Sequence, residues 1–162
     1  MKLATYSFKA DKQKRFGFVH ETYMIDILRA SAWANKTHNN SNFLHIPSSL
    51  KLALENWEPN LSYLKDLQNL VAENIIIGKQ ESLQPIATNI DDIKLYPPIT
   101  DPQSFRDFYA FEQHVKSARR LRGLDMNPDW YNLPIFYFSN PAALFGHNED
   151  ILYPKGTGEL DF

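Results

Sequence analysis

The proline-rich stretch YPPITDP, residues 96–102, sets the strongest constraint on how this chain folds. Proline fixes its own backbone dihedral φ and cannot donate a backbone hydrogen bond, so neither a helix nor a central strand can run through this stretch. The sequence therefore predicts two structural units, the first over residues 1–98 and the second over residues 99–162. A length of 162 residues suffices for one domain, or for one small domain with part of another.

The first unit opens with the alternation of apolar and polar residues that is typical of β-strands. Alternating positions carry apolar side chains in residues 2–8, 15–20 and 23–28, and a polar turn separates the first two segments. This pattern predicts a small antiparallel β unit over Lys2–Leu28, with Ile27 on the third strand. Asp26 lies between two isoleucines, and we expect it to face outward, with a buried acid as the alternative.

A helical region is expected next. The polar, Asn-rich residues 31–43 predict a loop after a short helix. Ser48 or Ser49 can cap a following helix that carries Leu50, Leu54 and Trp57 at helical spacing. Asn60 is expected to cap a further helix whose core-facing residues are Leu61, Leu64, Leu67 and Val71. This apolar repeat covers too few heptads for a coiled coil.

Composition excludes several classes of function. The net charge of −2 gives no general attraction to nucleic acid or to anionic membranes. The absence of cysteine excludes disulfides, a thiolate nucleophile and Cys-based metal sites. The chain begins without a signal-peptide pattern and has no apolar run near the roughly 20 residues of a membrane span. We therefore expect a cytoplasmic location, with neither nucleic acid nor membrane as a partner.

An acid and a histidine follow the proline-rich stretch closely. If a helix starts directly after Asp107, then Asp107, Phe111 and His114 share one helical face, with the acid and the imidazole about 10 Å apart along the axis. That distance is too long for a direct bond but suits two groups that hold opposite ends of a small ligand. Histidine titrates near neutral pH, which suits proton transfer. The alternatives are that Asp107 caps the helix and that His114 is structural.

A basic cluster lies on the same predicted helix, at Lys116, Arg119, Arg120 and Arg122. Nearby phenylalanines would allow it to bind RNA by stacking. Because the chain is acidic overall, we expect a solvated face or a subunit contact instead. Glu112 and Lys116, four residues apart, predict a surface ion pair.

Three motifs in the second half occur in a fixed order: FRDFYAFEQHVKSARRLRG, PDWYNLPIFYFSNPAALFG and PKGTGELDF. Together they resemble the fumarylacetoacetate hydrolase family, and the start of the chain is similar, more loosely, to the variable N-terminal domain of that family. The resemblance implies an α+β fold, in which an N-terminal antiparallel β unit with helices precedes the first part of a mainly-β catalytic domain. It also implies a Mg²⁺- or Ca²⁺-dependent hydrolase or lyase that cleaves C–C bonds of oxo acids or β-diketones, or decarboxylates or isomerises such acids.

The resemblance assigns roles to individual residues. By position in the motifs, Asp107 is a metal ligand and His114 is the general base that activates water. Tyr109 and Tyr137 line the substrate site. The family's substrate-binding arginine falls at Gly123, so Arg122, or alternatively Arg120, is expected to replace it. A small oxo acid is the implied substrate. A homodimer or a larger assembly is expected, because uncovered strand edges recruit other chains.

In the family, a segment like GELDF leads into a Glu-x-Glu pair that supplies two metal ligands, whereas this sequence stops at Phe162. We therefore expect the chain to be the N-terminal part of such an enzyme, and to be inactive by itself. The alternative is a non-catalytic assembly module that pairs with another chain. In either case we expect an uncovered strand edge and apolar surface at residues 135–138 and 160–162.

Overall fold

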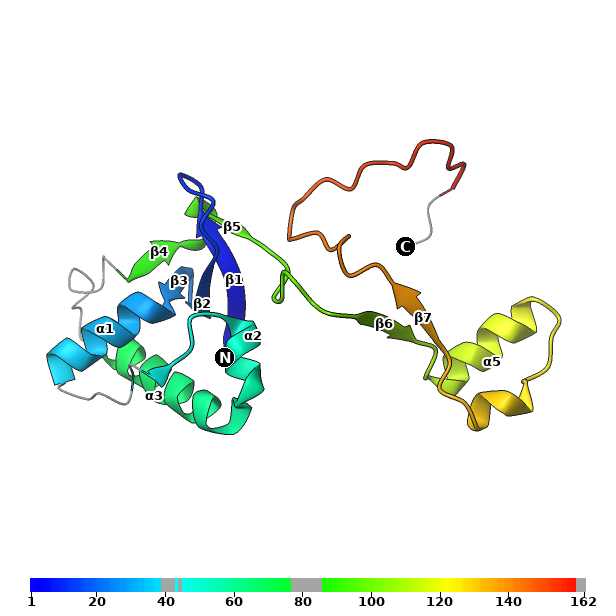
Figure 1. Cartoon of the computed structure of the whole chain (residues 1–162), viewed down its shortest axis with the longest axis horizontal. Coiled ribbons are helices and arrows are strands. Elements are labelled where there is room, and N and C mark those ends of the chain that lie inside the picture. Colours follow the sequence, from blue (N-terminus) through cyan, green and yellow to red (C-terminus); the bar gives the residue numbers. More distant parts are fainter. Residues whose placement is uncertain (39–42, 44, 77–85, 160–162) are drawn as a thin grey trace. The chain divides into compact units, whose positions relative to one another are not determined.

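The chain has an α+β fold made of two compact units. The computed structural model describes residues 1–38, 43, 45–76 and 86–159 (Figure 1). The first unit consists of Met1–Thr100 with Phe145–Phe162, and the second of Asp101–Leu144. The division after Thr100 lies inside the proline-rich stretch. The segment from Phe145 onward groups with the first unit, although the sequence suggested that it belongs with the second.

A five-stranded antiparallel sheet forms the centre of the first unit, in the order β4-β3-β2-β1-β5 (Figure 1). The strands are β1 (Lys2–Phe8), β2 (Arg15–His20), β3 (Tyr23–Asp26), β4 (Ala87–Asn89) and β5 (Ile93–Leu95). The first three confirm the antiparallel β unit read from the apolar alternation. The two edge strands were not predicted, because strands of three residues are too short to display a period of two.

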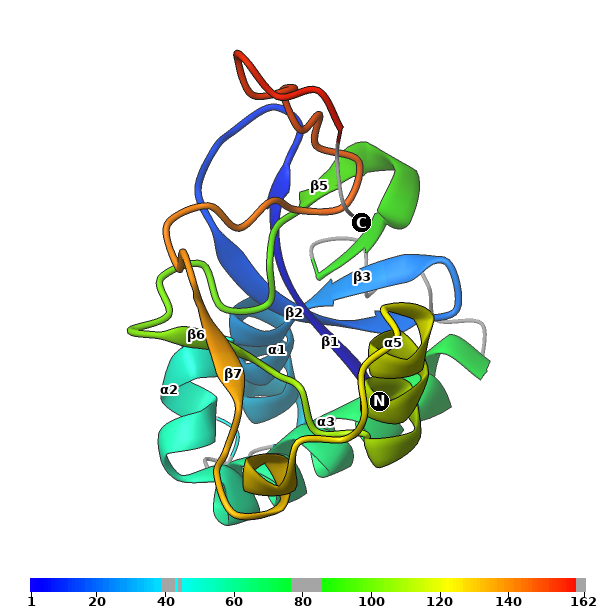
Figure 2. The ribbon, with the colours of Figure 1, turned by 90° about the vertical axis from the view of Figure 1, so that its right-hand side faces the viewer.

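Three helices accompany this sheet and gather on one side of it (Figures 1 and 2). They are α1 (Ile27–His38), α2 (Leu50–Glu55) and α3 (Trp57–Ile76). Two expectations were wrong, since Ile27 begins α1 instead of ending a strand, and residues 31–38 are helical instead of a loop. Ile27, Ala30 and Ala34 are buried along one face of α1, and this apolar face outweighs the polar composition of the segment. Residues 39–42 of the expected loop lie outside the described residues.

The helix caps show where local signals succeed and fail. Ser49 caps α2 as expected, because its hydroxyl accepts a hydrogen bond from the amide of Leu52 at 3.2 Å. Asn60 is not a cap, because α3 already begins at Trp57. The buried side chain of Asn60 instead donates to the carbonyl oxygen of Ala53 at 3.0 Å, which ties α3 to α2.

The main hydrophobic core lies between the sheet and the helices. Its fully buried members include Phe18 and Ile25 from the strands and Leu64, Leu67 and Val71 from α3. The expected core stripe of α3 is therefore largely confirmed. Two predicted positions differ: Leu61 is half-buried, and Leu54 of α2 is 46% exposed.

The opposite face of the sheet carries a smaller buried cluster, made of Tyr6, Met24 and Ile93. Asp26 lies on this face and is only 4% exposed, so the expectation of an outward-facing acid was wrong. Its carboxylate accepts hydrogen bonds from the Tyr6 hydroxyl at 3.0 Å and from the Arg29 amide at 3.0 Å, and Arg15 lies 3.6 Å away. These partners allow an ionised carboxylate to be buried at a tolerable cost.

The second unit is a two-stranded antiparallel sheet with one helix. Its strands are β6 (Phe105–Phe108) and β7 (Phe136–Ser139), which pair antiparallel, and its helix is α5 (Glu112–Leu121). A short 3₁₀ helix, η3 (Pro128–Tyr131), lies between α5 and β7. In this unit, which the structure describes completely, Val115 is the one fully buried residue. The unit therefore has almost no core of its own.

Across the described parts of both units, no helix combines the length and the apolar character needed to span a membrane.

Candidate active-site cleft

The residues that the sequence singled out come from three elements of the second unit. Asp107 lies on β6, directly opposite Tyr137 of β7 in the pairing of these two strands. The expectation that Asp107 starts or caps a helix was wrong, because α5 begins only at Glu112. The apolar, β-prone residues around Asp107 favour a strand once β7 provides hydrogen-bonding partners.

Tyr109 follows β6 and is held by its backbone. Its amide donates to the carbonyl oxygen of Ile135 at 2.9 Å, and its own carbonyl oxygen accepts a hydrogen bond from the indole Nε1 of Trp130 at 2.7 Å. This contact positions Tyr109 at the bend between β6 and α5. Sequence reasoning gave no role to Trp130, and only the tertiary contact identifies it.

His114 lies in the first turn of α5 and meets Tyr109 edge to face. The two ring centroids are 5.6 Å apart and the ring planes are nearly perpendicular, at 89°. This contact fixes one side of the imidazole ring and leaves the rest exposed, since His114 belongs to the exposed residues. An imidazole in such a position remains accessible to water and to a substrate.

Asp107, Tyr109, His114 and Tyr137 line one open cleft of about 420 Å³, together with Phe108, Ala110 and Phe111. The structure thus brings together four of the five candidate residues. The fifth, Arg122, ends α5 as its C-cap residue and does not line the cleft, and neither does Arg120. Among the described residues, no arginine lines this cleft.

The expected ion pair on α5 is present and has a third member. Glu112 and Lys116 lie 2.6 Å apart, and the Tyr131 hydroxyl donates to the same carboxylate oxygen at 2.6 Å. The Lys116 ammonium, and after it the Tyr131 hydroxyl, lower the pKa of the Glu112 carboxyl below its usual range. All three groups are exposed, so the cluster is a surface feature that ties η3 to α5.

The basic residues of α5 have ordinary structural roles where the structure gives them partners. Lys116 belongs to the ion pair with Glu112, and the Arg119 guanidinium donates to the carbonyl oxygen of Asp125. Positive side chains near the end of a helix also compensate the negative end of its dipole. The solvated-face interpretation therefore accounts for two members of the cluster without a nucleic-acid partner.

The donor set of the cleft is small for a metal ion. Asp107 is the one carboxylate among its lining residues, and no group of three or more His, Asp or Glu side chains suited to a metal occurs in the part of the chain that the structure describes. Mg²⁺ and Ca²⁺ take at least six oxygen ligands. A carboxylate is the right kind of ligand for such hard cations, but further ligands would have to come from outside the lining residues.

Comparisons with known proteins identify no relative. A scan against protein-family models finds no match to this sequence, and a search among curated proteins finds none. The likeness to the fumarylacetoacetate hydrolase family therefore rests on the three motifs themselves and stays a hypothesis.

Proposed function

We propose that the cleft of Asp107, Tyr109, His114 and Tyr137 is part of a metal-dependent site, of the fumarylacetoacetate hydrolase type, for cleaving C–C bonds of oxo acids or β-diketones. The observation that carries the proposal is that these four residues, which come from two strands, a bend and a helix, line one cleft. Metal-dependent hydrolysis uses a carboxylate to hold the ion and a base to activate water, and the cleft offers an acid, an imidazole and two phenols for such roles.

Each side chain has a distinct role in this proposal. Asp107 would hold Mg²⁺ or Ca²⁺, which when bound polarises a substrate carbonyl. The exposed His114 imidazole takes a proton from the attacking water as a general base. The Tyr109 and Tyr137 hydroxyls donate hydrogen bonds to the carboxylate of the substrate, which orients it in the cleft.

The roles of Asp107 and His114 can be separated by two variants, in a form of the protein that turns over an oxo acid or β-diketone. His114→Ala should lower kcat by about 10²–10⁴ and leave the metal content near normal, because the imidazole acts on water. Asp107→Ala should lose metal and activity together. His45→Ala, at an exposed histidine of the first unit, is the control and should keep full activity. Retention of more than about a third of kcat in His114→Ala would make His114 a structural residue.

For residues 1–162 alone, we propose that there is no turnover and no tight Mg²⁺ site, because one carboxylate does not offset the dehydration of the ion. Calorimetric titration with Mg²⁺ and Ca²⁺ tests this directly. A site of about micromolar affinity that disappears in Asp107→Ala would show that the assignment of ligands is wrong.

A second candidate function is that of an assembly module. The second unit exposes large apolar side chains, among them Phe111 (79%), Tyr137 (75%), Phe138 (74%) and Leu121 (89%). Residues 135–138 are largely exposed, as expected, while residues 160–162 lie outside the described residues. Exposed apolar side chains are common at protein–protein contacts.

We propose that this surface pairs with a second copy of the chain, because an unpaired strand edge recruits another strand. Light scattering after size-exclusion chromatography should then give a dimer, and Phe138→Ser should shift it toward monomer. Exposed Leu52 of α2 offers the control, Leu52→Ser, which should leave the dimer intact. A monomer at high protein concentration would remove the assembly proposal and leave the catalytic one to be judged by the His114 and Asp107 variants.

A further inference from the structure

A second polar site lies in the first unit, at the end of β1 and along β5. Ser7 and Lys94 are directly opposite each other in the register of these strands, and the amide of Lys9 donates to the carbonyl oxygen of Asp92 at 3.2 Å. Because side chains alternate across a sheet, Ser7, Lys9, Lys94 and Tyr96 leave the two strands on the same face. We call this group, with Lys12 of the β1–β2 turn, the lysine site.

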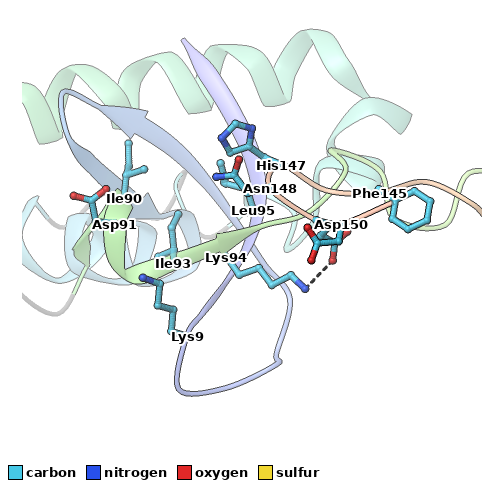
Figure 3. Close-up of a pocket in the computed structure, with 11 residues that line it drawn as sticks. Lys9, Ile90, Asp91, Ile93, Lys94, Leu95, Phe145, His147, Asn148 and Asp150 are labelled. Carbon is cyan, nitrogen blue, oxygen red and sulfur yellow. Dashed lines mark ion pairs between the residues drawn. The ribbon is translucent and has the colours of Figure 1, made fainter. Parts of the chain in front are cut away.

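The lysine site borders two hollows that share Lys9 and Lys94. One, of about 340 Å³, is lined by Ser7, Phe8, Lys9, Asp11, Lys12, Lys94 and Tyr96. The other, of about 810 Å³, lies beside β5 and the segment from Phe145 to Asp150, and Figure 3 shows Lys9 and Lys94 at it. Both volumes are in the range of small-molecule pockets.

The floor of the smaller hollow is built from ordered hydroxyl groups. The Ser7 side chain is 1% exposed, and its Oγ lies 3.3 Å from the Tyr96 hydroxyl, with either able to donate. The Ser7 hydroxyl also donates to the carbonyl oxygen of Phe8 at 3.2 Å, and while it does so the Tyr96 hydroxyl is the donor to Ser7 Oγ. The contact therefore holds the Tyr96 ring at the hollow, and the lysines supply the free donors there.

The site is positive in a chain whose net charge is −2. Three lysines of the site line the smaller hollow, at positions 9, 12 and 94, and the Lys14 ammonium lies 5.4 Å from the centre of the Tyr96 ring. Asp11, the one acid among the described residues that line the smaller hollow, lies 3.4 Å from Arg15. The larger hollow is lined by Asp91, Glu149 and Asp150, and Glu149 lies 2.7 Å from Lys94. Within the described residues, Lys9 and Lys12 form no ion pair, so their ammonium groups are available to an anion.

The donor types favour a phosphate group. A lysine ammonium is a compact point charge on a flexible stem, and lysine is a common phosphate ligand. We propose that the lysine site binds the phosphate group of a small-molecule ligand. A nucleic acid fits less well, because the hollow is compact and the carboxylates of Asp11 and Glu149 border it.

The test is a titration of the full chain with inorganic phosphate and with pyrophosphate, followed by the NMR shifts of backbone amides and by calorimetry. We expect shifts centred on Ser7, Lys9, Lys94 and Tyr96, and tighter binding of pyrophosphate than of phosphate. Lys9→Gln and Lys12→Gln should each raise the Kd of pyrophosphate by about fivefold. Lys65→Gln, at an exposed lysine of α3, is the matched control and should leave the Kd unchanged.

A gain-of-affinity variant separates a site from a merely charged surface. Glu149→Gln removes the carboxylate that competes for Lys94, so it should lower the Kd severalfold, while Glu73→Gln at an exposed position of α3 should not. Equal effects of Lys9→Gln and Lys65→Gln, or shifts centred elsewhere, would overturn the proposal. So would a short single-stranded oligonucleotide that binds more tightly than pyrophosphate and loses affinity in the same lysine variants.

Discussion

The buried contact between Tyr6 and Asp26 allows a quantitative prediction about stability and pH. Tyr6 is fully buried on β1, and its hydroxyl donates to the Asp26 carboxylate at 3.0 Å. Tyr6→Phe keeps the ring and removes only this hydrogen bond. A hydrogen bond to a charged group contributes about 1.5–3 kcal/mol to the free energy of unfolding. We expect about 1.5–2 kcal/mol here, because Asp26 keeps the Arg29 amide and the nearby Arg15 as partners.

The same contact also predicts how the stability of the protein changes at alkaline pH. Burial, and after it the Asp26 carboxylate, raises the pKa of the Tyr6 hydroxyl far above the 10.0 of a free tyrosine. Above pH 10.0 the unfolded chain therefore releases this proton while the folded chain keeps it, and wild-type stability falls as pH rises. Phenylalanine has no such proton. The stability difference between wild type and Tyr6→Phe should therefore shrink by up to about 1.4 kcal/mol for each pH unit above that point.

Urea unfolding followed by circular dichroism, at neutral pH and at several pH values above 10, measures both quantities. Tyr23→Phe is the control, since the half-buried Tyr23 hydroxyl makes no hydrogen bond with any of the residues that the structure describes. The reasoning is refuted if Tyr6→Phe is as stable as wild type at neutral pH, or if the difference stays constant up to about pH 11.

Two further predictions concern the core of the first unit, and thermal or urea unfolding checks both. Leu64→Ala should destabilise the protein by about 2–5 kcal/mol, because the side chain is fully buried between α3 and the sheet. Leu54→Ala, at a 46% exposed leucine, should cost much less, and equal losses would contradict the assignment of the core. Gly17→Ala should destabilise by about 1–3 kcal/mol, because the new Cβ would lie 2.6 Å from the Met24 sulfur and 2.7 Å from the Ile25 carbonyl oxygen. Gly158→Ala, where a Cβ meets nothing within 4 Å, should be neutral.

Part of the candidate cleft could be anticipated from the sequence. Asp107, Tyr109 and His114 are close in the chain, so any local structure keeps them near one another. Their geometry was not anticipated, because a helix was expected at Asp107 and a strand is found. Tyr137 joins them only because β7 pairs with β6, a hydrogen-bonded contact that no local pattern predicts. Arg122 lies next to α5 as its C-cap residue and does not line the cleft, so its proposed contact with the substrate stays a prediction.

The sequence alone determined the features that depend on near neighbours. The alternation in residues 2–26 specified three strands, and the spacing of Leu64, Leu67 and Val71 specified the buried face of α3. Ser49 specified the start of α2 through a hydroxyl three residues from its partner amide.

Only the tertiary structure decided the features that depend on distant partners. β4 and β5 form because they hydrogen-bond to β3 and β1, respectively. Each has only three residues, which is too short for an alternation of apolar and polar side chains to predict a strand. Asp26 is buried because Tyr6 of β1 and Arg15 of β2 contact it, and the lysine site forms because β5 places Lys94 opposite Ser7. Periodicity and capping act over a few residues, whereas the pairing of strands and the burial of charge depend on contacts between residues far apart in the chain.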